Sequence, residues 1–163
     1  MFTALINAAQ QRLVIVTPYF VLDDALMLTI TSAALRGVHV TLINSAAKDQ
    51  FLVTHAQRSY YEQLLRAGVE VLQYQRPNLL HPKAIVADDQ IALIGSSKLD
   101  LRSFILNMEV SLVKYELVMV AELHTIVARY AACSNQVALA DWVQRPIHQR
   151  LLENIARLTT ALQ

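Results

Sequence analysis

Two stretches of similar pattern decide the fold: residues 33–40, AALRGVHV, and residues 64–71, LLRAGVEV. In each, an apolar segment containing an arginine leads into a glycine and then into alternating β-branched residues. Glycine just after a helix permits the left-handed turn that ends it, and a cation suits the carboxyl end of the helix. β-branched residues favour extended structure. The pattern predicts two helix-to-strand units, which need not mean a duplicated domain.

Working outward from these units, helices and strands are expected to alternate along the first half of the chain. Helices are predicted over about residues 3–11, 24–36, 56–67, 116–132 and 147–161. Strands are predicted over residues 13–17, 38–43, 69–74, 80–87, 91–96 and 107–113, with irregular chain over 97–106 and 133–146. The predicted fold class is α/β, a mixed β-sheet flanked by helices on both faces.

Composition excludes several classes of protein. The chain has 163 residues, of which 55% are hydrophobic and 17% charged, so disorder is excluded and one domain with a real core is expected. A net charge of +1 gives no general argument for a nucleic-acid partner. Cys133 is the only cysteine, which excludes an internal disulfide or a cysteine-based zinc site. No uncharged stretch exceeds 11 residues, too short for a transmembrane segment.

Reactive side chains are densest between residues 81 and 109. On the strand expected over 80–87, His81 and Lys83 point the same way, roughly 6–7 Å apart. An imidazole can attack phosphorus or move a proton, and an ammonium can hold phosphate oxygens. Pro82 between them suggests the start or edge of a strand.

A second group of polar residues follows the expected hairpin. Gly95 allows close backbone approach, and the Ser96 hydroxyl can donate to a phosphate oxygen. On the strand expected over 107–113, Asn107, Glu109 and Ser111 share one face. Glu109 is therefore a carboxylate able to orient an imidazole.

The spacing of these residues resembles the HxKx4Dx6GSxN motif of the phospholipase D superfamily. The matching residues are His81, Lys83, Asp88, Gly95 and Ser96, with Glu109 matching the downstream acid of that family. Further stretches resemble the C-terminal half of bacterial cardiolipin synthases. They are TPYF at 17–20, RGV at 36–38, LDLRSF at 99–104, LNME at 106–109 and WVQRP at 142–146.

The resemblance implies a phospholipase D-like fold and double displacement through a phosphohistidine. It makes His81, Lys83 and Glu109 catalytic, and it makes Lys83, Ser96 and Lys98 phosphate-binding. For the motif residues Asp88 and Gly95 a structural role stays open, since Asp88 lies beside a turn where aspartate commonly bonds locally. This chemistry requires no metal and no organic cofactor.

Two features depart from the family pattern. Lys98 stands where the motif has asparagine; it keeps a donor and adds charge, but its length can obstruct substrate. Family active sites combine two HxK motifs, whereas this sequence has one. The expectation is therefore a single domain over 1–163, one half of a two-motif enzyme, completed by a missing N-terminal half or by a second copy in a homodimer.

The sequence leaves three functions open. The first is phospholipid transphosphatidylation, making cardiolipin from phosphatidylglycerol. The alternatives are a homodimeric phosphodiesterase or nuclease of the same superfamily, and a degenerate domain that binds phospholipid headgroups or a partner. For the parent protein the resemblance implies contact with the cytoplasmic side of the bacterial inner membrane. Trp142 is expected either to anchor the tail by packing or to touch a membrane interface.

Overall fold

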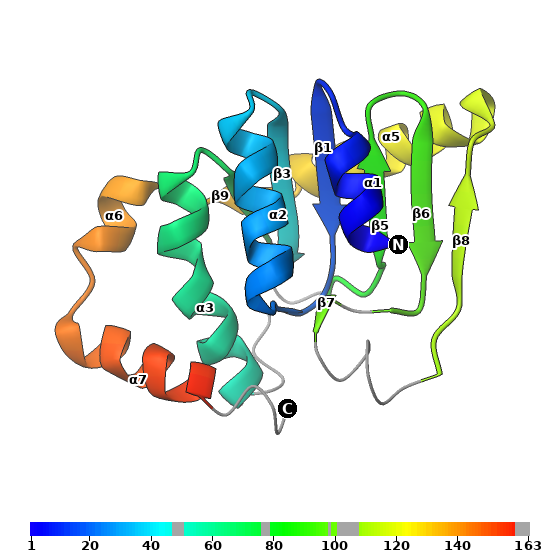
Figure 1. Cartoon of the computed structure of the whole chain (residues 1–163). Helices are drawn as coiled ribbons and strands as arrows, with labels where there is room; N and C mark the ends of the chain where they lie inside the picture. The colour runs from blue at the N-terminus through cyan, green and yellow to red at the C-terminus, as the bar shows by residue number, and fades with distance from the viewer. Residues whose placement is uncertain (47–50, 76–78, 98, 101–107, 159–163) are drawn as a thin grey trace.

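The structure is a computed structural model of the chain, and it describes residues 1–46, 51–75, 79–97, 99–100 and 108–158. A β-sheet carries helices on both faces, as Figure 1 shows. The helices are α1 (Phe2–Ala8), α2 (Asp24–Leu35), α3 (Phe51–Arg66), α5 (Leu117–Ala132), α6 (Leu139–Val143) and α7 (Ile147–Leu158). The strands are β1 (Arg12–Val16), β2 (Phe20–Val21), β3 (His39–Ser45), β4 (Glu70–Tyr74), β5 (Ala84–Ala87), β6 (Ile91–Gly95), β7 (Leu99–Asp100), β8 (Ser111–Lys114) and β9 (Ser134–Gln136).

Seven of the described strands form one sheet in the order β8-β6-β5-β1-β3-β4-β9. On one side of β1, strands β3 and β4 run parallel to it, as their helical connections require. On the other side, β5, β6 and β8 follow as antiparallel neighbours. Strands β2 and β7 pair separately, in parallel. The predicted fold class, a mixed sheet between helices, is confirmed.

The hydrophobic core lies in two layers, one on each face of the sheet. Alternate residues of β1 divide between them: Leu13 and Ile15 pack beneath α1, α2 and α3, whereas Val14 and Val16 pack beneath α5. This follows from the two-residue period of a strand. Because strand β1 is buried on both faces, it consists almost wholly of aliphatic residues.

Both helix-to-strand units form as expected. Gly37 and Gly68 adopt φ of 93° and 90°, the left-handed region that glycine enters without steric cost. After each glycine the chain enters β3 or β4 directly. At the other end of α2, the Asp23 carboxylate accepts a hydrogen bond of 2.7 Å from the Leu26 backbone N–H and caps the helix.

Several boundary predictions were wrong, and β7 lies within the stretch expected to be irregular over 97–106. The strand expected over 80–87 begins at Ala84, because Ala84 pairs with Val16, the last residue of β1, and Pro82 has no N–H to give a ladder. The stretch expected to be irregular over 133–146 contains β9 and α6. The short polar strand β9 forms because the edge of β4 offers its unpaired backbone groups, which local sequence does not reveal.

Candidate functional site

The segment 81–83 lies just before β5, at the end of the sheet where β1 finishes. The His81 side chain is exposed, whereas Lys83 is buried. The two residues precede the strand rather than forming part of it, so the expected alternation of strand side chains does not apply to them. The irregular backbone instead lets the lysine fold back toward the histidine.

Lys83 and His81 are in direct contact. The Lys83 ammonium Nζ lies 3.1 Å from His81 Nδ1 and 3.3 Å from Nε2, and it donates to the His81 carbonyl oxygen at 2.8 Å. An ammonium can donate to a ring nitrogen only where that nitrogen is unprotonated. The arrangement therefore places a fixed positive charge beside a nucleophilic or proton-accepting nitrogen, as phosphoryl chemistry requires.

The glycine and serine of the motif lie beside this pair, across the β5–β6 hairpin. The Gly95 backbone N–H donates to the Lys83 carbonyl oxygen at 3.1 Å, which ties the two parts of the motif together. A Cβ on Gly95 would lie 2.5 Å from the carbonyl oxygen of Val110, in the segment that precedes β8. Only glycine fits this close approach, so Gly95 has a structural reason for its place.

Ser96 is exposed and joins the site to the segment that precedes β8. Its hydroxyl oxygen accepts from the Val110 N–H at 3.0 Å, and its own N–H donates to the Val110 carbonyl at 2.9 Å. The hydroxyl also contacts the Val110 carbonyl at 3.4 Å, near the limit of a hydrogen bond. Its proton can therefore turn to a phosphate oxygen at little cost.

Glu109 is half-buried and is the residue just before Val110. The strand expected over 107–113 begins, in its described part, at Ser111, so Glu109 lies on the irregular segment that approaches Ser96. Asn107 and Lys98 lie outside the described residues. The structure thus brings the 81–83 segment, Gly95 and Ser96 together and places Glu109 one residue from the Ser96 contact.

Asp88 lies at the other end of β5, about 16 Å of extended chain from Lys83. Its carboxylate accepts hydrogen bonds of 2.8–2.9 Å from the backbone N–H groups of Gln10, Gln11 and Arg12. It therefore holds the α1–β1 connection to the β5–β6 turn. This geometry is that of a structural residue, the role that the sequence left open.

Removing the charge of Asp88 is expected to have a pH-dependent cost. Burial raises its pKa, but the three backbone donors and the Arg12 charge outweigh burial, and the pKa is lowered. Because the pKa is lower in the folded chain, the ionised carboxylate stabilises the fold at pH values above the unfolded pKa, about 3.9. This stabilisation is lost as pH falls through the folded pKa. Asp88→Asn tolerates the same positive φ of 51° and should lower the free energy of unfolding by about 1 kcal/mol at pH 7.

Urea unfolding at pH 7 and near pH 3 measures this effect. The difference should begin to shrink below about pH 3.9, where the unfolded carboxyl takes up a proton, and should shrink further as pH falls through the lowered folded pKa. An unchanged difference at both values would show that charge plays no part in the Asp88 contacts.

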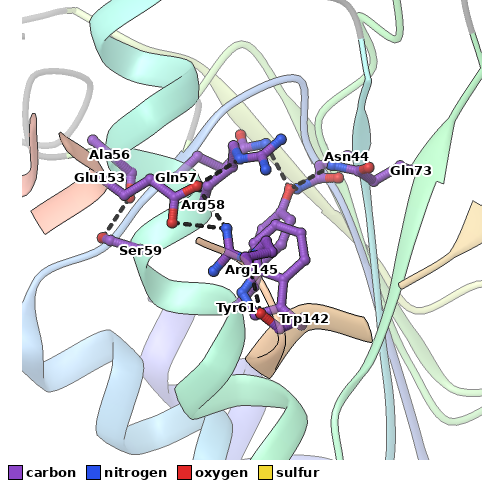
Figure 2. Close-up of polar contacts among 10 residues, drawn as sticks. All are labelled: Asn44, Ala56, Gln57, Arg58, Ser59, Tyr61, Gln73, Trp142, Arg145 and Glu153. Carbon is purple, nitrogen blue, oxygen red and sulfur yellow. Dashed lines mark hydrogen bonds and ion pairs between the residues drawn. The ribbon is translucent and has the colours of Figure 1, made fainter. Parts of the chain in front are cut away.

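A buried polar cluster was not foreseen from the sequence (Figure 2). The Tyr61 hydroxyl accepts from the Gln57 amide at 2.8 Å, from the Gln73 amide at 3.3 Å and from the amide of Asn44. Burial raises the pKa of Tyr61, so the phenol stays neutral. The Gln57 side-chain oxygen also accepts from the Phe20 N–H at 3.1 Å and so holds β2 in place. Strand β2 pairs with β7, which follows Ser96 and Ser97 in the sequence. The sequence signal that could have indicated this cluster is the spacing of Gln57 and Tyr61, which lie four residues apart on α3 and so share one side of the helix.

The same view shows how Trp142 is used. Its ring packs at 4.9 Å from that of Tyr61, and the Arg145 guanidinium lies 3.4 Å from its centre. Trp142 is buried, so the packing interpretation is confirmed over the membrane contact. Within the described residues, no cluster of side chains suits a metal ion and no helix is long and apolar enough to cross a membrane.

Comparisons with known proteins agree with this geometry. A family model described as "Cardiolipin synthase, PLD-like domain" matches residues 2–131. Cardiolipin synthase A of Proteus mirabilis is 39% identical over 150 residues, which are 92% of this chain and 31% of that protein. Cardiolipin synthase of Alkalihalophilus pseudofirmus is 37% identical over 162 residues, 99% of this chain and 32% of that protein. The chain thus spans about a third of these relatives.

Solved structures show the same fold. The phospholipase D family member Nuc from Salmonella typhimurium superposes with a TM-score of 0.73 at 15% identity, covering 84% of this chain and 88% of that chain. Phosphatidylserine synthase of Haemophilus influenzae superposes with a TM-score of 0.75 at 20% identity, covering 96% of this chain and 42% of that chain. The match to the family model covers most of the residues, including the His81–Lys83 pair. The chain therefore belongs to the family of cardiolipin synthase PLD-like domains.

Proposed function

We propose that the chain supplies one catalytic half of a phospholipid transphosphatidylase that makes cardiolipin from phosphatidylglycerol. The observation that carries the proposal is the contact between His81 and Lys83, joined through the Gly95 backbone to Ser96. An imidazole, a fixed ammonium and a hydroxyl that is only weakly engaged as a donor are the groups that a phosphodiester needs for attack and charge neutralisation. The relatives named cardiolipin synthase supply the substrate class.

The proposed reaction is double displacement. One histidine attacks the phosphorus of phosphatidylglycerol, forming a P–N bond while the P–O bond to glycerol breaks. A second histidine gives a proton to the leaving glycerol. It then takes a proton from the hydroxyl of a second phosphatidylglycerol, whose oxygen displaces the first histidine from phosphorus. In two-motif relatives of this superfamily the first-half histidine acts as nucleophile, so His81 is the proton carrier; in a homodimer two copies of His81 divide the roles.

The second histidine must come from another half-site. The segment beside Ser96 and the edge strand β8 expose large apolar residues, which favours a partner covering them. These residues are Met108, Val110, Leu112, Tyr115, Leu117 and Val118. The apolar surface is contiguous in sequence and borders the site, where a partner half or a second copy would bring the second motif.

Turnover by the purified chain tests the proposal. Phosphatidylglycerol vesicles and a soluble phosphodiester, bis(p-nitrophenyl) phosphate, are the two substrates, with His81→Ala as the control. We expect His81-dependent release of glycerol together with cardiolipin. Hydrolysis of the soluble diester without cardiolipin would favour the homodimeric phosphodiesterase instead.

If the chain alone is inactive, it can replace the matching third of the Proteus mirabilis relative, whose remaining chain supplies the other half. A chimaera active with His81 and inactive with alanine supports the half-site. Activity regained only after Lys98→Asn would assign the loss to the departure from the motif. Inactivity of both chimaeras, with phosphatidylglycerol still bound, would favour the degenerate binding domain.

A further inference from the structure

Helix α7 carries its apolar side outward. Ile147 and Leu158 are 81% and 83% exposed, and Leu151 and Ile155 between them are also exposed. Their spacing of four, four and three residues aligns them along one side of the helix, and we call these four residues the α7 stripe. A surface helix of a globular domain normally turns such a side toward the core. The α7 stripe is thus reversed relative to the usual arrangement.

Polar contacts fix this reversed orientation. Glu153, on the inner side of α7, is 2% exposed and accepts from Arg58 at 2.8 Å and from Arg145 at 2.6 and 2.8 Å (Figure 2). Breaking a buried carboxylate away from its cations is costly. Rotating α7 to bury the stripe would break both of these ion pairs, so the outward orientation is specified by the sequence.

Helix α7 lies along the same end of the molecule as the candidate site (Figure 1). Its Arg157 reaches Asp24, at the start of α2, at 3.5 Å, and stacks 4.6 Å from the centre of the Tyr60 ring. The Tyr60 hydroxyl in turn donates to the Leu22 carbonyl at 2.9 Å. These contacts attach α7 to the chain that follows β1 and β2, at the sheet end where the 81–83 segment lies.

The charged residues of α7 indicate which kind of surface would bind the α7 stripe. The only carboxylate of the helix, Glu153, is buried, while Arg150 and Arg157 are partly exposed. Each arginine has an acidic neighbour: Arg150 pairs with Glu62 at 3.3 Å and Arg157 with Asp24 at 3.5 Å. An apolar stripe bordered on one side by arginines suits the boundary between anionic headgroups and acyl chains, where amphipathic helices lie in the membrane plane.

We propose that α7 is an interfacial helix that seats the domain on an anionic phospholipid bilayer, with the α7 stripe at the acyl boundary. The bilayer then meets the end of the sheet that carries His81 and Lys83. The inference deepens the proposed function by naming the surface through which a lipid substrate would be approached. Its test measures binding and not turnover, so either proposal can fail while the other stands.

Flotation with vesicles tests the proposal on the whole chain. The vesicles contain phosphatidylglycerol and phosphatidylethanolamine, and a parallel set contains phosphatidylcholine alone. We expect the chain to float with the anionic set more than with the neutral set. Leu151→Gln with Ile155→Gln should lower partitioning about a hundredfold, since each buried aliphatic side chain contributes about tenfold. Glutamine keeps helix propensity, and circular dichroism verifies the fold.

The matched control is Leu28→Gln with Leu35→Gln, two exposed leucines on α2. This control should bind as the wild type does. Equal loss in both variants, or no flotation of the wild type, would overturn the proposal. So would light scattering that shows a dimer dissociated by the α7 variant, because a second copy would then cover the stripe.

A second readout locates the bound surface. With Cys133, the only cysteine, replaced by serine, a single cysteine at position 151 or at position 35 carries an environment-sensitive dye. Vesicles should shift the emission to shorter wavelength at position 151 and leave position 35 unchanged. A shift at position 35 alone would place the bilayer on another surface and contradict the proposal.

Discussion

Lys83→Met should lower turnover by about 10²–10³-fold in the assembly where the chain is active, the usual effect of removing one charge-stabilising donor. The reason lies in the geometry around Nζ, which contacts both ring nitrogens and the carbonyl oxygen of His81. Methionine has nearly the same length and shape but no charge, so it removes the ammonium while filling its space. The loss should appear in kcat, because the charge matters most as negative charge develops on phosphate oxygens.

Stability separates this effect from simple unfolding. Lys83 is buried, and replacing a buried ammonium by an apolar side chain removes a desolvation cost. The lost hydrogen bond to the His81 carbonyl costs about 1 kcal/mol and so offsets part of that gain. The melting temperature should therefore stay within a few degrees of the wild type. Full activity in the methionine variant would exclude Lys83 from catalysis, whereas collapse of the melting temperature would give it a structural role instead.

Glu153→Ala should lower the free energy of unfolding by about 3–5 kcal/mol, because it leaves two arginines without their buried partner. Arg145 would remain stacked on Trp142 with its charge uncompensated. For a chain of this size the loss corresponds to a fall of about 6–20 °C in melting temperature. Urea unfolding followed by circular dichroism measures it.

Glu62→Gln is the comparison for this second effect. Glu62 pairs with Arg66 and Arg150, but those contacts are more exposed, so the change should cost at most about 1 kcal/mol. Equal effects at both positions would mean that burial of Glu153 does not strengthen its ion pairs. A fall much larger than 5 kcal/mol would mean that the whole of α6 and α7 detaches with the carboxylate.

Sequence reasoning reached the fold because its strongest signals are local. Gly37 and Gly68 need only their neighbours to end a helix, and strand β1 carries aliphatic residues on both sides. These features depend on short-range sterics and burial. The start of β5 was misplaced because it is set by Val16, a partner 68 residues away in the chain.

The candidate site was found through spacing, and its contacts were not. The HxK spacing placed His81 near Lys83, but the folding back of the ammonium depends on irregular backbone before β5. Asp88 keeps its motif position by bonding to residues 10–12, which no local pattern indicates. Glu153 reads as a solvated charge on an amphipathic helix, and only packing against α3 reveals it as buried.

The pairing of β1 with β5 has a consequence for the order in which the molecule assembles. The parallel unit β1-β3-β4 and the hairpins of β5, β6 and β8 each close over short sequence distances, whereas Leu13 meets Ala87 across 74 residues. Closing so long a loop costs entropy before any contact repays it. We expect this seam to form late in folding, so that the amino-terminal unit acts as the template on which the β5–β6 hairpin, next to the candidate site, docks.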